Sequence, residues 1–323
     1  MLGAAPTLET KVAGGAQCRL LVVILNFNGM SDTLACLESL ASQTCTDFRA
    51  LVIDNGSRSD EAADIRLHFP AIEVLATGEN LGWAGGNNIG IRAALDRGAE
   101  HICLLNNDTV LAPAALDELL LAADIIGEPF LLHPAIAYFE GEVEWQLYPI
   151  RPTSVFEAPR SYDPATGIIE MDYAYGACLM FPTLLARKIG LLDERLFLQL
   201  EETDYFVRAA AIGVRSACAR RARISHRESA SFNGRVTPDK TYYQVRNGLL
   251  LARKHRRTLR GKLGAVRELL WSLHGKAQAL HPALPGWTGF TRWLFSGDPF
   301  ACATRQGVRD FVASRFGKRI NLP

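Results

Sequence analysis

Short apolar runs alternate with helix-like segments through the first part of the chain. Each apolar run ends abruptly in polar or turn-forming residues, which is typical of a buried strand. The predicted strands cover residues 19–25, 48–53, 72–76 and 101–105, and the predicted helices cover residues 32–42, 87–97 and 113–126. Such alternation predicts an α/β fold in which helices flank a mostly parallel sheet.

The pattern becomes irregular further along the chain. Residues 129–170 are rich in proline and aromatic side chains, so we expect loops and short strands around a substrate cleft. A strand is then predicted at 177–181, with helices at 182–189 and at about 203–212. Basic residues recur through 253–267, where we expect one helix, and several tryptophans and phenylalanines follow it.

Composition limits the class of protein. The chain of 323 residues is 48% hydrophobic and 21% charged, which excludes a disordered protein and suffices for a large domain with an appendage. The apolar run at 20–25 is far shorter than the roughly 20 residues that a bilayer-spanning helix needs. The 7 cysteines lack CxxC spacing, as expected of core residues in a reducing compartment. We therefore expect a cytoplasmic protein with neither a signal peptide nor a membrane span.

The net charge of +1 conceals a division along the chain. Residues 1–150 hold 7 Lys or Arg against 20 Asp or Glu, whereas residues 151–323 hold 28 against 14. Basic residues beside tryptophans near the C-terminus suit the surface of an anionic membrane. A solvated helix that packs its aromatic side chains on the main domain explains the same pattern. Nucleic acid is disfavoured as a partner, because the acidic half would repel phosphate and no nucleic-acid motif is present.

Polar turns follow the first two predicted strands. Residues 26–29 (Asn-Phe-Asn-Gly) and 54–57 (Asp-Asn-Gly-Ser) each come directly after an apolar run. The carboxyl ends of parallel strands meet at one edge of a sheet, where open α/β folds bind their ligands. Asparagine side chains and free amides there can contact a nucleotide, and Asp54 can accept a hydrogen bond from a base. Each cluster taken alone is also an ordinary turn with a helix cap.

The segment 79–88, Glu-Asn-Leu-Gly-Trp-Ala-Gly-Gly-Asn-Asn, is more specific. Its glycines permit a close approach of the backbone, and we expect Asn87 and Asn88 to open a helix whose free amides attract an anion. The segment is neither a dinucleotide GxGxxG motif nor a GxxxxGK[ST] phosphate loop. The usual sequence evidence for a nicotinamide-binding or an ATP-hydrolysing protein is therefore missing from this segment.

Acidic residues supply the candidate chemistry. Asp108 with Asn106 forms half a site for Mg²⁺ or Mn²⁺, since hard cations take one or two carboxylates plus phosphate oxygens; a strand-end helix cap is the alternative. Residues 201–204 (Glu-Glu-Thr-Asp) place three carboxylates at a predicted helix start, where capping accounts for one or two. A carboxylate in a closed cleft can also deprotonate an acceptor hydroxyl. His226 is either a surface histidine or a metal ligand.

Together these motifs resemble the inverting glycosyltransferases of family 2, which have the GT-A fold, and among them the rhamnosyltransferase-like and galactofuranosyltransferase-like branch. The resemblance spans roughly residues 20–255. Residues 22–29 are similar to the opening strand of that family, 54–57 to its base-binding turn and 80–88 to its diphosphate segment. Residues 106–108 resemble its DxD metal motif, 176–178 its acceptor-side segment, and 192–204 the stretch that ends in its Glu-Asp-x-Asp motif.

The resemblance implies a role for each matched residue. The implied nucleotide-sugar contacts are Asn26, Asn28, Asp54, Asn55, Asn80, Gly82, Gly85, Asn87 and Asn107. The implied ligands of a Mg²⁺ or Mn²⁺ ion are Asp108, Asn106 and His226. Glu202 matches the catalytic base and Asp204 supports the site, while Gly176, Ala177 and Glu201 lie on the acceptor side.

The resemblance also implies a domain plan and a set of partners. A flexible segment at 1–18 precedes a GT-A domain at 19–255, and a basic amphipathic helical region covers 256–323. Within the domain, residues 19–128 hold the nucleotide-sugar, and residues 129–255 hold the acceptor and the catalytic groups. The donor is a dTDP- or UDP-sugar, the acceptor is a glycan or a lipid-linked glycan, and the work is done in the cytoplasm at the inner face of the membrane. The oligomeric state, a homodimer included, stays open.

Two residues depart from the family pattern. Asp108 is the single aspartate of a motif that can hold two, so we expect a weakly held, nucleotide-dependent metal. Glu202 stands where aspartate is usual, so either it or Asp204 is the base. A binding protein without catalysis would tolerate replacement of Glu202. A nucleotidyltransferase would need a basic, glycine-rich loop after its first strand, and residues 26–29 hold no basic residue.

Overall fold

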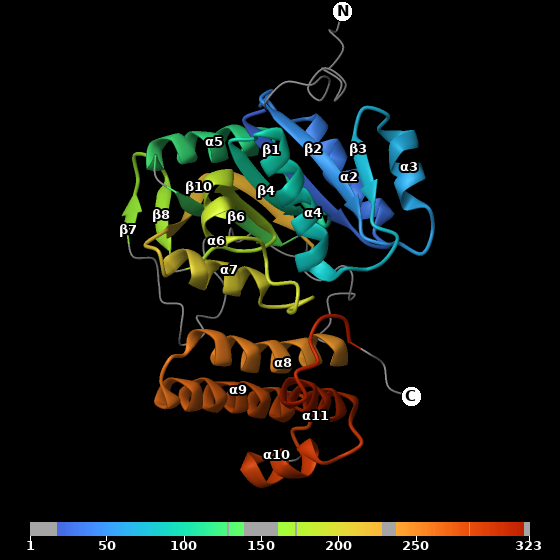
Figure 1. The fold of residues 1–323 in the computed structure, drawn as a ribbon, viewed down its shortest axis with the longest axis vertical. Coiled ribbons are helices and arrows are strands. Elements are labelled where there is room, and N and C mark those ends of the chain that lie inside the picture. Colours follow the sequence, from blue (N-terminus) through green and yellow to red (C-terminus); the bar gives the residue numbers. More distant parts are fainter. Residues whose placement is uncertain are drawn as a thin grey trace, which may run out of the picture. The chain divides into compact units, whose positions relative to one another are not determined.

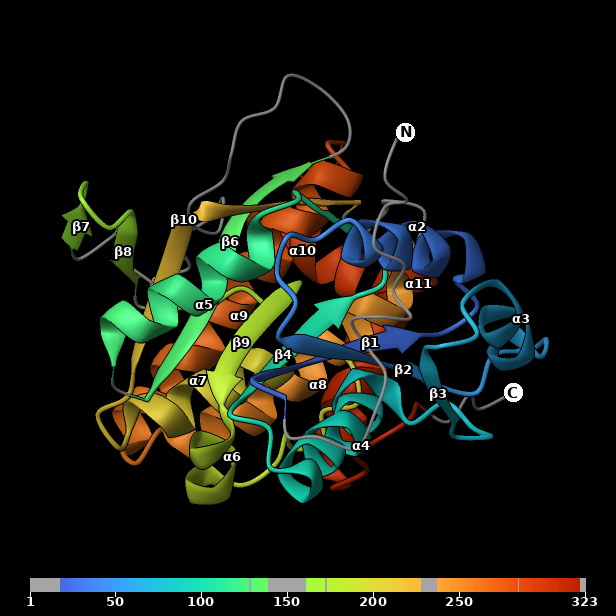
Figure 2. The same ribbon diagram turned by 90° about the horizontal axis from the view of Figure 1, so that it is seen from above.

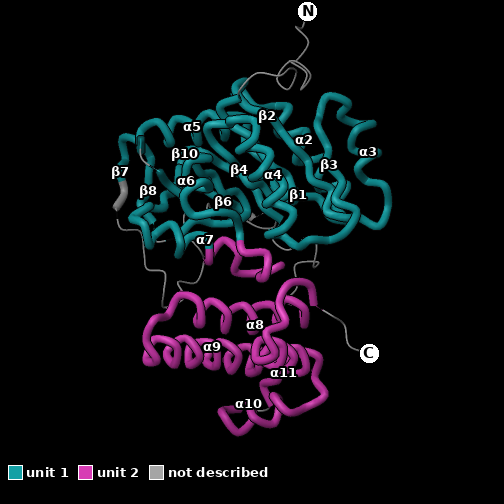
Figure 3. The backbone as a smooth tube through the Cα atoms, in the orientation of Figure 1, with its two compact units in different colours: residues 1–192, 205–234 teal, residues 193–204, 235–323 magenta. Residues whose placement is uncertain are grey.

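The computed structural model describes residues 18–127, 129–138, 161–171, 173–227, 237–283 and 285–319. The chain forms two compact units, shown in Figure 3: unit 1 is residues 1–192 and 205–234, and unit 2 is residues 193–204 and 235–323. The predicted flexible segment 1–18 lies outside the described residues except for Cys18. Residues 235–255, which the sequence assigned to the GT-A domain, group with the C-terminal helices.

One sheet runs through unit 1 in the order β3-β2-β1-β4-β9-β6-β10-β8-β7, and β5 pairs with β10 (Figure 1). The strands are β1 (Leu20–Asn26), β2 (Phe48–Asp54), β3 (Glu73–Ala76), β4 (His101–Asn106), β5 (Thr109–Leu111), β6 (Phe130–Tyr138), β7 (Ser161–Asp163), β8 (Ile168–Met171), β9 (Cys178–Pro182) and β10 (Arg215–His226). Strands β3, β2, β1 and β4 pair in parallel, whereas β9 pairs antiparallel to β4 and to β6, and β8 pairs antiparallel to β10. The α/β fold is confirmed, but the sheet is mixed rather than mostly parallel.

Helices cover both faces of this sheet (Figure 2). Successive residues of β1 point to opposite faces, as strand geometry requires, so Val22 and Ile24 belong to one core and Leu21 and Val23 to the other. The first core is closed by α2 (Met30–Ala41), α3 (Glu61–His68) and α5 (Ala115–Ile126), and the second by α4 (Gly82–Arg97), α6 (Thr183–Ile189) and the end of α7 (Glu201–Ala210).

Helix α4 begins at Gly82, five residues before its predicted start. The glycines that suggested a loop are helical because the helix packs very closely on the sheet. A Cβ on Gly86 would lie 2.3 Å from Leu25 Cδ1, and one on Gly90 would lie 2.2 Å from Val23 Cγ1. Asn87 therefore lies in the second turn and does not supply the free amides of the helix start, which is a correction of the prediction.

Strand β10 was not predicted from the sequence, where this part of the chain is a basic stretch. Arg221 and Arg223 are exposed, while Ala222 and Ile224 between and after them are buried, so the stretch does alternate as a strand. A register shift against β6 between Ala219 and Arg223 interrupts that alternation and hides it from a pattern search.

Unit 2 consists of residues 193–204 and the helices α8 (Pro238–His255), α9 (Leu259–Leu280), α10 (Gly286–Leu294) and α11 (Pro299–Val312). The single helix predicted over 253–267 is instead two, because Arg256 is extended and the Thr258 side chain caps α9 by accepting from Gly261 N at 3.1 Å. The core of unit 2 includes Val245 and Trp293. Among the described helices, none has the length and apolar content needed to cross a membrane.

Candidate active site

A buried hydrogen-bond network around Asn26 holds the first two polar turns together. Asn26 is fully buried, and its Nδ2 donates to Asp54 Oδ1 at 3.0 Å and to Glu61 Oε2 at 2.8 Å. Its Oδ1 accepts from Thr33 Oγ1 at 2.7 Å, and Ser57 Oγ donates to Asp54 Oδ1 at 2.5 Å. Asn26 thus orients the Asp54 carboxylate and does not present its own amide to solvent.

Asn28 lies at the exposed tip of the first turn, with a φ of 51°. Its backbone N–H donates to Ser57 Oγ at 2.9 Å, and its Oδ1 accepts from Arg58 N at 2.9 Å. The turns at 26–29 and 54–57 therefore form one structure at the carboxyl edge of the parallel strands.

Asn55 joins this structure to the start of α4. Its Nδ2 donates to Gly82 O at 3.1 Å, and its Oδ1 accepts from Leu81 N at 3.1 Å. Asn80 Oδ1 accepts from Gly82 N at 2.8 Å. Asn55 is 2% exposed, so it acts on a ligand only by shaping the backbone around Gly82.

Asn87 is buried in the second turn of α4, close behind Gly85. Its Nδ2 donates to Trp83 O at 2.9 Å, whereas its Oδ1 has no hydrogen-bond partner among the described residues. A buried carbonyl oxygen left unpaired is costly, and a water or ligand hydroxyl would satisfy it. A Cβ on Gly85 would lie 2.8 Å from Leu81 Cβ, so this glycine serves the packing of the helix start.

Asn106 and Asn107 end β4 at the same edge of the sheet. Asn106 Oδ1 accepts from Trp83 Nε1 at 3.0 Å, and its N–H donates to Ala177 O at 2.9 Å. That second bond draws Ala177 and the preceding glycine, Gly176, to this edge. Asn107 Nδ2 donates to Thr33 Oγ1 at 2.9 Å, which ties the end of β4 to α2.

Asp108 and His226 meet although they are far apart in the sequence. The β5–β10 ladder places His226 opposite Thr109, and Arg227 N donates to Asp108 O at 2.9 Å. His226 Nε2 lies 3.1 Å from Asp108 Oδ1, and the two side chains are 5% and 11% exposed. The two groups are close but not aligned for a hydrogen bond, so neither imidazole nitrogen has a hydrogen-bond partner among the described residues.

A divalent cation fits this pair. A carboxylate oxygen and an unpartnered imidazole nitrogen that approach each other are two ligands that Mn²⁺ accepts, and Mg²⁺ accepts the carboxylate. The described residues contain no cluster of three or more His, Cys, Asp or Glu that could hold a metal. Asp108 and His226 therefore need further oxygen ligands from a substrate or from water, which agrees with a weakly held metal. Asn106 Oδ1 is already engaged by Trp83, which leaves it one lone pair for a cation.

Glu201 and Glu202 open α7, which begins two residues before its predicted start. Glu201 is 2% exposed, and its Oε1 has no hydrogen-bond partner in the described part of the chain. Burial, with the charge of Glu202 second, raises the pKa of Glu201 well above its usual range, which favours the neutral acid. Glu202 is half-buried. Glu201 is therefore better placed as a neutral neighbour of Glu202 than as an acceptor contact.

Asp204, one turn into α7, is fully buried and paired with cations. Its Oδ1 lies 2.7 Å from both Lys254 Nζ and His255 Nε2 at the end of α8. Lys254 also donates to Asp193 Oδ2 at 2.8 Å, and although burial opposes it, hydrogen bonds from Arg195 and Lys254 lower the pKa of Asp193. Asp204 is thus engaged in holding the start of α7 to the end of α8.

Several residues of these networks carry no motif in the sequence. Glu61 looks like an ordinary acidic residue in the first turn of α3, and Lys254 and His255 look like the basic last turn of α8. Trp83 gives no sign of its bond to Asn106. Each is recognisable only once the fold has supplied its partner.

Unit 1 has parallel strands, joined polar turns at their carboxyl edge and a carboxylate–imidazole pair beside these turns. These features define the class of open α/β proteins that bind a ligand at that edge. The sequence profile described as glycosyl transferase family 2 matches residues 21–183. The chain therefore belongs to glycosyl transferase family 2 and is a glycosyltransferase.

Curated relatives include hexosyl- and rhamnosyltransferases of low identity. The low-salt glycan biosynthesis hexosyltransferase Agl10 of Haloferax volcanii is 27% identical over 195 residues, which cover 59% of this chain and 61% of that protein. The dTDP-rhamnosyl transferase RfbF of Shigella flexneri is 24% identical over 274 residues, 79% of this chain and 86% of the relative. The N-acetylglucosaminyl-diphospho-decaprenol L-rhamnosyltransferase of Mycobacterium tuberculosis is 24% identical over 268 residues, 72% of this chain and 87% of the relative.

Solved structures agree on the fold. TarS 1–349 of S. aureus has a TM-score of 0.56 at 15% identity, over 92% of this chain and 83% of that one. GalNAc-T7, solved with UDP, GalNAc and Mn²⁺, has a TM-score of 0.55 at 15% identity, over 83% of this chain and 58% of that one. These likenesses confirm the GT-A fold that the sequence predicted.

Proposed function

We propose that the protein transfers a sugar, rhamnose or a similar hexose, from a dTDP- or UDP-sugar to a hydroxyl of a cell-surface glycan or a lipid-linked oligosaccharide, with inversion at the anomeric carbon. The observation that carries the proposal is the Asp108–His226 pair beside the joined polar turns. The names of two relatives, a dTDP-rhamnosyl transferase and a decaprenol-linked rhamnosyltransferase, support this class of donor and acceptor.

In this proposal unit 1 binds the sugar donor. Asp54, oriented by Asn26 and Ser57, accepts a hydrogen bond from an N–H of the base. The positive end of the helix dipole, at the start of α4, attracts the diphosphate. Asp108 and His226 would hold a Mg²⁺ or Mn²⁺ ion, which when bound supplies positive charge to the leaving nucleoside diphosphate.

Glu202 is the proposed general base. It is half-buried at the first turn of α7, whereas Glu201 favours its neutral form and Asp204 is engaged by Lys254 and His255. Glu202 takes the proton of the acceptor hydroxyl as that oxygen attacks the anomeric carbon and the nucleoside diphosphate leaves. Attack from the face opposite to the leaving group inverts the configuration.

Calorimetric titration with UDP, dTDP, GDP and NAD, each with and without Mn²⁺, tests the donor site. We expect UDP or dTDP to bind more tightly with Mn²⁺, and Asp108→Ala to remove that gain, by about tenfold or more. Asp117→Ala, a matched change on α5, should leave the gain intact. Binding of NAD alone, or of no nucleotide at all, would refute the proposal.

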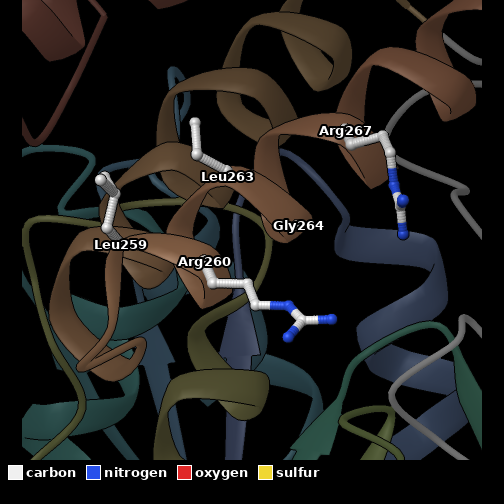
Figure 4. A pocket seen from close by; sticks show the side chains of 5 residues that line it. All are labelled: Leu259, Arg260, Leu263, Gly264 and Arg267. Carbon is white, nitrogen blue, oxygen red and sulfur yellow. The ribbon is translucent and has the colours of Figure 1, made fainter.

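We further propose that α9 rests on an anionic membrane surface, where lipid-linked acceptors reside. Leu259 and Leu263 are 72% and 60% exposed, and together with Arg260, Gly264 and Arg267 they line a pocket on α9 (Figure 4). Exposed leucines beside arginines fit the boundary between lipid headgroups and acyl chains. The expected location is therefore cytoplasmic and peripheral to the inner face of the membrane.

A further inference from the structure

The backbone just before α7 has an unusual conformation. Phe197, Gln199 and Leu200 have φ angles of 62°, 73° and 73°, in the left-handed region that residues with a side chain rarely adopt. Such conformations persist only where the surrounding structure determines them. The residues that follow directly are Glu201 and Glu202, so this loop leads into the proposed base.

Asn247 on α8 binds the backbone of this loop. It is fully buried, and its Nδ2 donates to the carbonyls of Leu196, Leu198 and Gln199 at 2.8, 2.9 and 2.8 Å. Three carbonyls converge on one amide group because the left-handed residues turn them to the same side of the loop. In an extended loop successive carbonyls alternate in direction, so those of Leu198 and Gln199 would point to opposite sides.

Arg246, also fully buried, completes the contact. Its Nη2 donates to the carbonyls of Arg195 and Leu196, each at 3.0 Å. Its Nε donates to Asn247 Oδ1 at 3.0 Å, which fixes the Asn247 amide with its NH₂ group toward the loop. Its Nη1 donates to Gly317 O at 2.6 Å, so the segment after α11 is tied to the same point. We call Arg246 and Asn247 the loop clamp.

The same helix makes a second contact beyond the loop. Lys254 and His255 hold Asp204, and Asp204 N donates to Leu200 O at 3.0 Å. Helix α8 therefore engages the chain on both sides of Glu202, at residues 195–199 through the loop clamp and at Asp204 through its last turn.

We propose that Arg246 and Asn247 are positioning residues for Glu202: they hold the loop at 195–200 in its left-handed conformation, so that α7 starts at Glu201 and the Glu202 carboxylate has a defined place and direction. The inference rests on the proposed role of Glu202 as the base. A displacement of about 1 Å at a catalytic group lowers turnover by about a hundredfold, so such support is worth measuring.

Amide hydrogen exchange tests the clamp without reference to activity. We expect Asn247→Ala to raise exchange at residues 196–204 by at least tenfold while the strands of unit 1 keep their protection. Gln244→Ala is the matched control and should leave exchange unchanged. Gln244 Nε2 donates to the Gln199 side chain at 3.3 Å and not to the loop backbone, and its Oε1 accepts from Lys276 Nζ at 3.1 Å. Unchanged exchange in Asn247→Ala overturns the clamp. If Asn247→Ala fails to fold, Asn247→Ser, which keeps one donor, takes its place.

Steady-state kinetics test whether the clamp acts through Glu202. With Asn247→Ala we expect kcat to fall by at least tenfold while KM for the donor changes by less than about twofold. In a Glu202→Gln background the same change should lower kcat by less than about twofold, because residues that act as a unit are non-additive. Equal losses in the two backgrounds would mean that Asn247 only stabilises the fold, and would overturn the positioning role.

These two measurements separate the inference from the proposed function. A wild-type protein that releases no nucleoside diphosphate from any sugar donor, yet shows the expected exchange change in Asn247→Ala, keeps the clamp and refutes the transferase mechanism together with the role of Glu202. An active wild type in which Asn247→Ala changes neither exchange nor kcat refutes the clamp alone.

Discussion

Three carboxylates within four residues of α7 have three different environments. Glu201 is buried beside an acidic neighbour, Glu202 is half-buried, and Asp204 is buried against two cationic partners. Differences in burial and in neighbouring charge give neighbouring acids different roles. A general base must reach its substrate and must bind a proton, and a cationic partner lowers the proton affinity of a carboxylate. The motif favoured Glu202 as the base and left Asp204 as the alternative, and the surroundings of the two carboxylates support Glu202 for the proposed role.

Replacement of Glu202 by glutamine keeps the shape of the side chain and removes its basicity. We expect Glu202→Gln to lower the transfer rate by about 10² or more while the affinity for the nucleoside diphosphate stays the same. Release of nucleoside diphosphate from the sugar donor, followed over time, measures the rate, and calorimetry measures the affinity.

Asp204→Asn provides the comparison for that experiment. It should lower the free energy of unfolding, because Lys254 and His255 lose a buried anion, and it should retain some transfer. Normal turnover in Glu202→Gln, together with complete loss in a folded Asp204→Asn, would assign the base to Asp204.

Helix α4 shows where sequence patterns succeed and where they fail. Its existence and its end at Arg97 follow from the apolar spacing and from Gly98, which caps it in the left-handed conformation. Its start was wrong by five residues, because three glycines in a short stretch indicate a loop unless a neighbouring strand is known to press against them. That strand is β1, and its Leu25 lies against Gly86.

Gly90 gives this close packing a measurable consequence. We expect Gly90→Ala to destabilise unit 1 by about 1–3 kcal/mol, because the new methyl group would lie 2.2 Å from Val23 Cγ1 in a packed core. Thermal unfolding should shift down by about 2–4 °C for each kcal/mol. Gly275→Ala in α9, where no atom of the described structure lies within 4 Å of the new Cβ, should be neutral or stabilising by up to about 1 kcal/mol. Equal shifts for the two variants would contradict the packing argument.

The parts of the candidate site that depend on neighbouring residues in the sequence were predictable, and the parts that depend on long-range contacts were not. The turns at 26–29 and 54–57 are recognisable as polar clusters after apolar runs, and the parallel register places Asn26 opposite Asp54. The Asp108–His226 pair depends on β10, whose alternation is broken by a register shift, so the residues alone left His226 between a surface role and a metal role. The loop clamp depends on φ angles at 197–200 that no composition signals.

The charge division of the chain has a counterpart in its two compact units. Unit 2 holds the basic helices α8 and α9, and its exposed side chains include Leu259, Leu263 and Trp271. Some of the aromatic residues pack within unit 2, because Trp293 is buried and the rings of Trp271 and Trp287 lie 5.0 Å apart. The membrane hypothesis therefore rests on the exposed leucines and arginines of α9 more than on the tryptophans.

A double replacement tests that surface. We expect Leu259→Glu with Leu263→Glu to weaken binding to vesicles rich in phosphatidylglycerol by at least about tenfold. Each leucine that inserts into the lipid contributes about 1.5–3 kcal/mol to the binding free energy, and the new charges repel anionic lipid. Vesicle sedimentation measures the binding, and uncharged vesicles should bind the wild type weakly. Leu67→Glu changes a leucine of unit 1 that is 77% exposed and should bind as the wild type does. Equal binding by the double variant and the wild type would refute a membrane role for α9.

Deletion of the region after α8 is a poor substitute for these replacements. Such a deletion would remove Gly317, whose carbonyl accepts from Arg246, and Asp310, whose carboxylate accepts from Tyr242 at 2.9 Å. It would therefore disturb the loop clamp together with the membrane surface, and a loss of activity would not tell the two apart.

The bond from Arg246 to Gly317 sets an order of events during translation. Ribosomes add about 5–20 residues per second, so Glu202 is synthesised on the order of ten seconds before Gly317. In that interval the nascent chain holds every strand of the parallel group and the Asp108–His226 pair, but the loop before Glu202 still lacks part of its support. On our proposal, the nascent chain can bind its donor before it can use it, because the loop before Glu202 gains its full support only once Gly317 has been made and has bonded to Arg246.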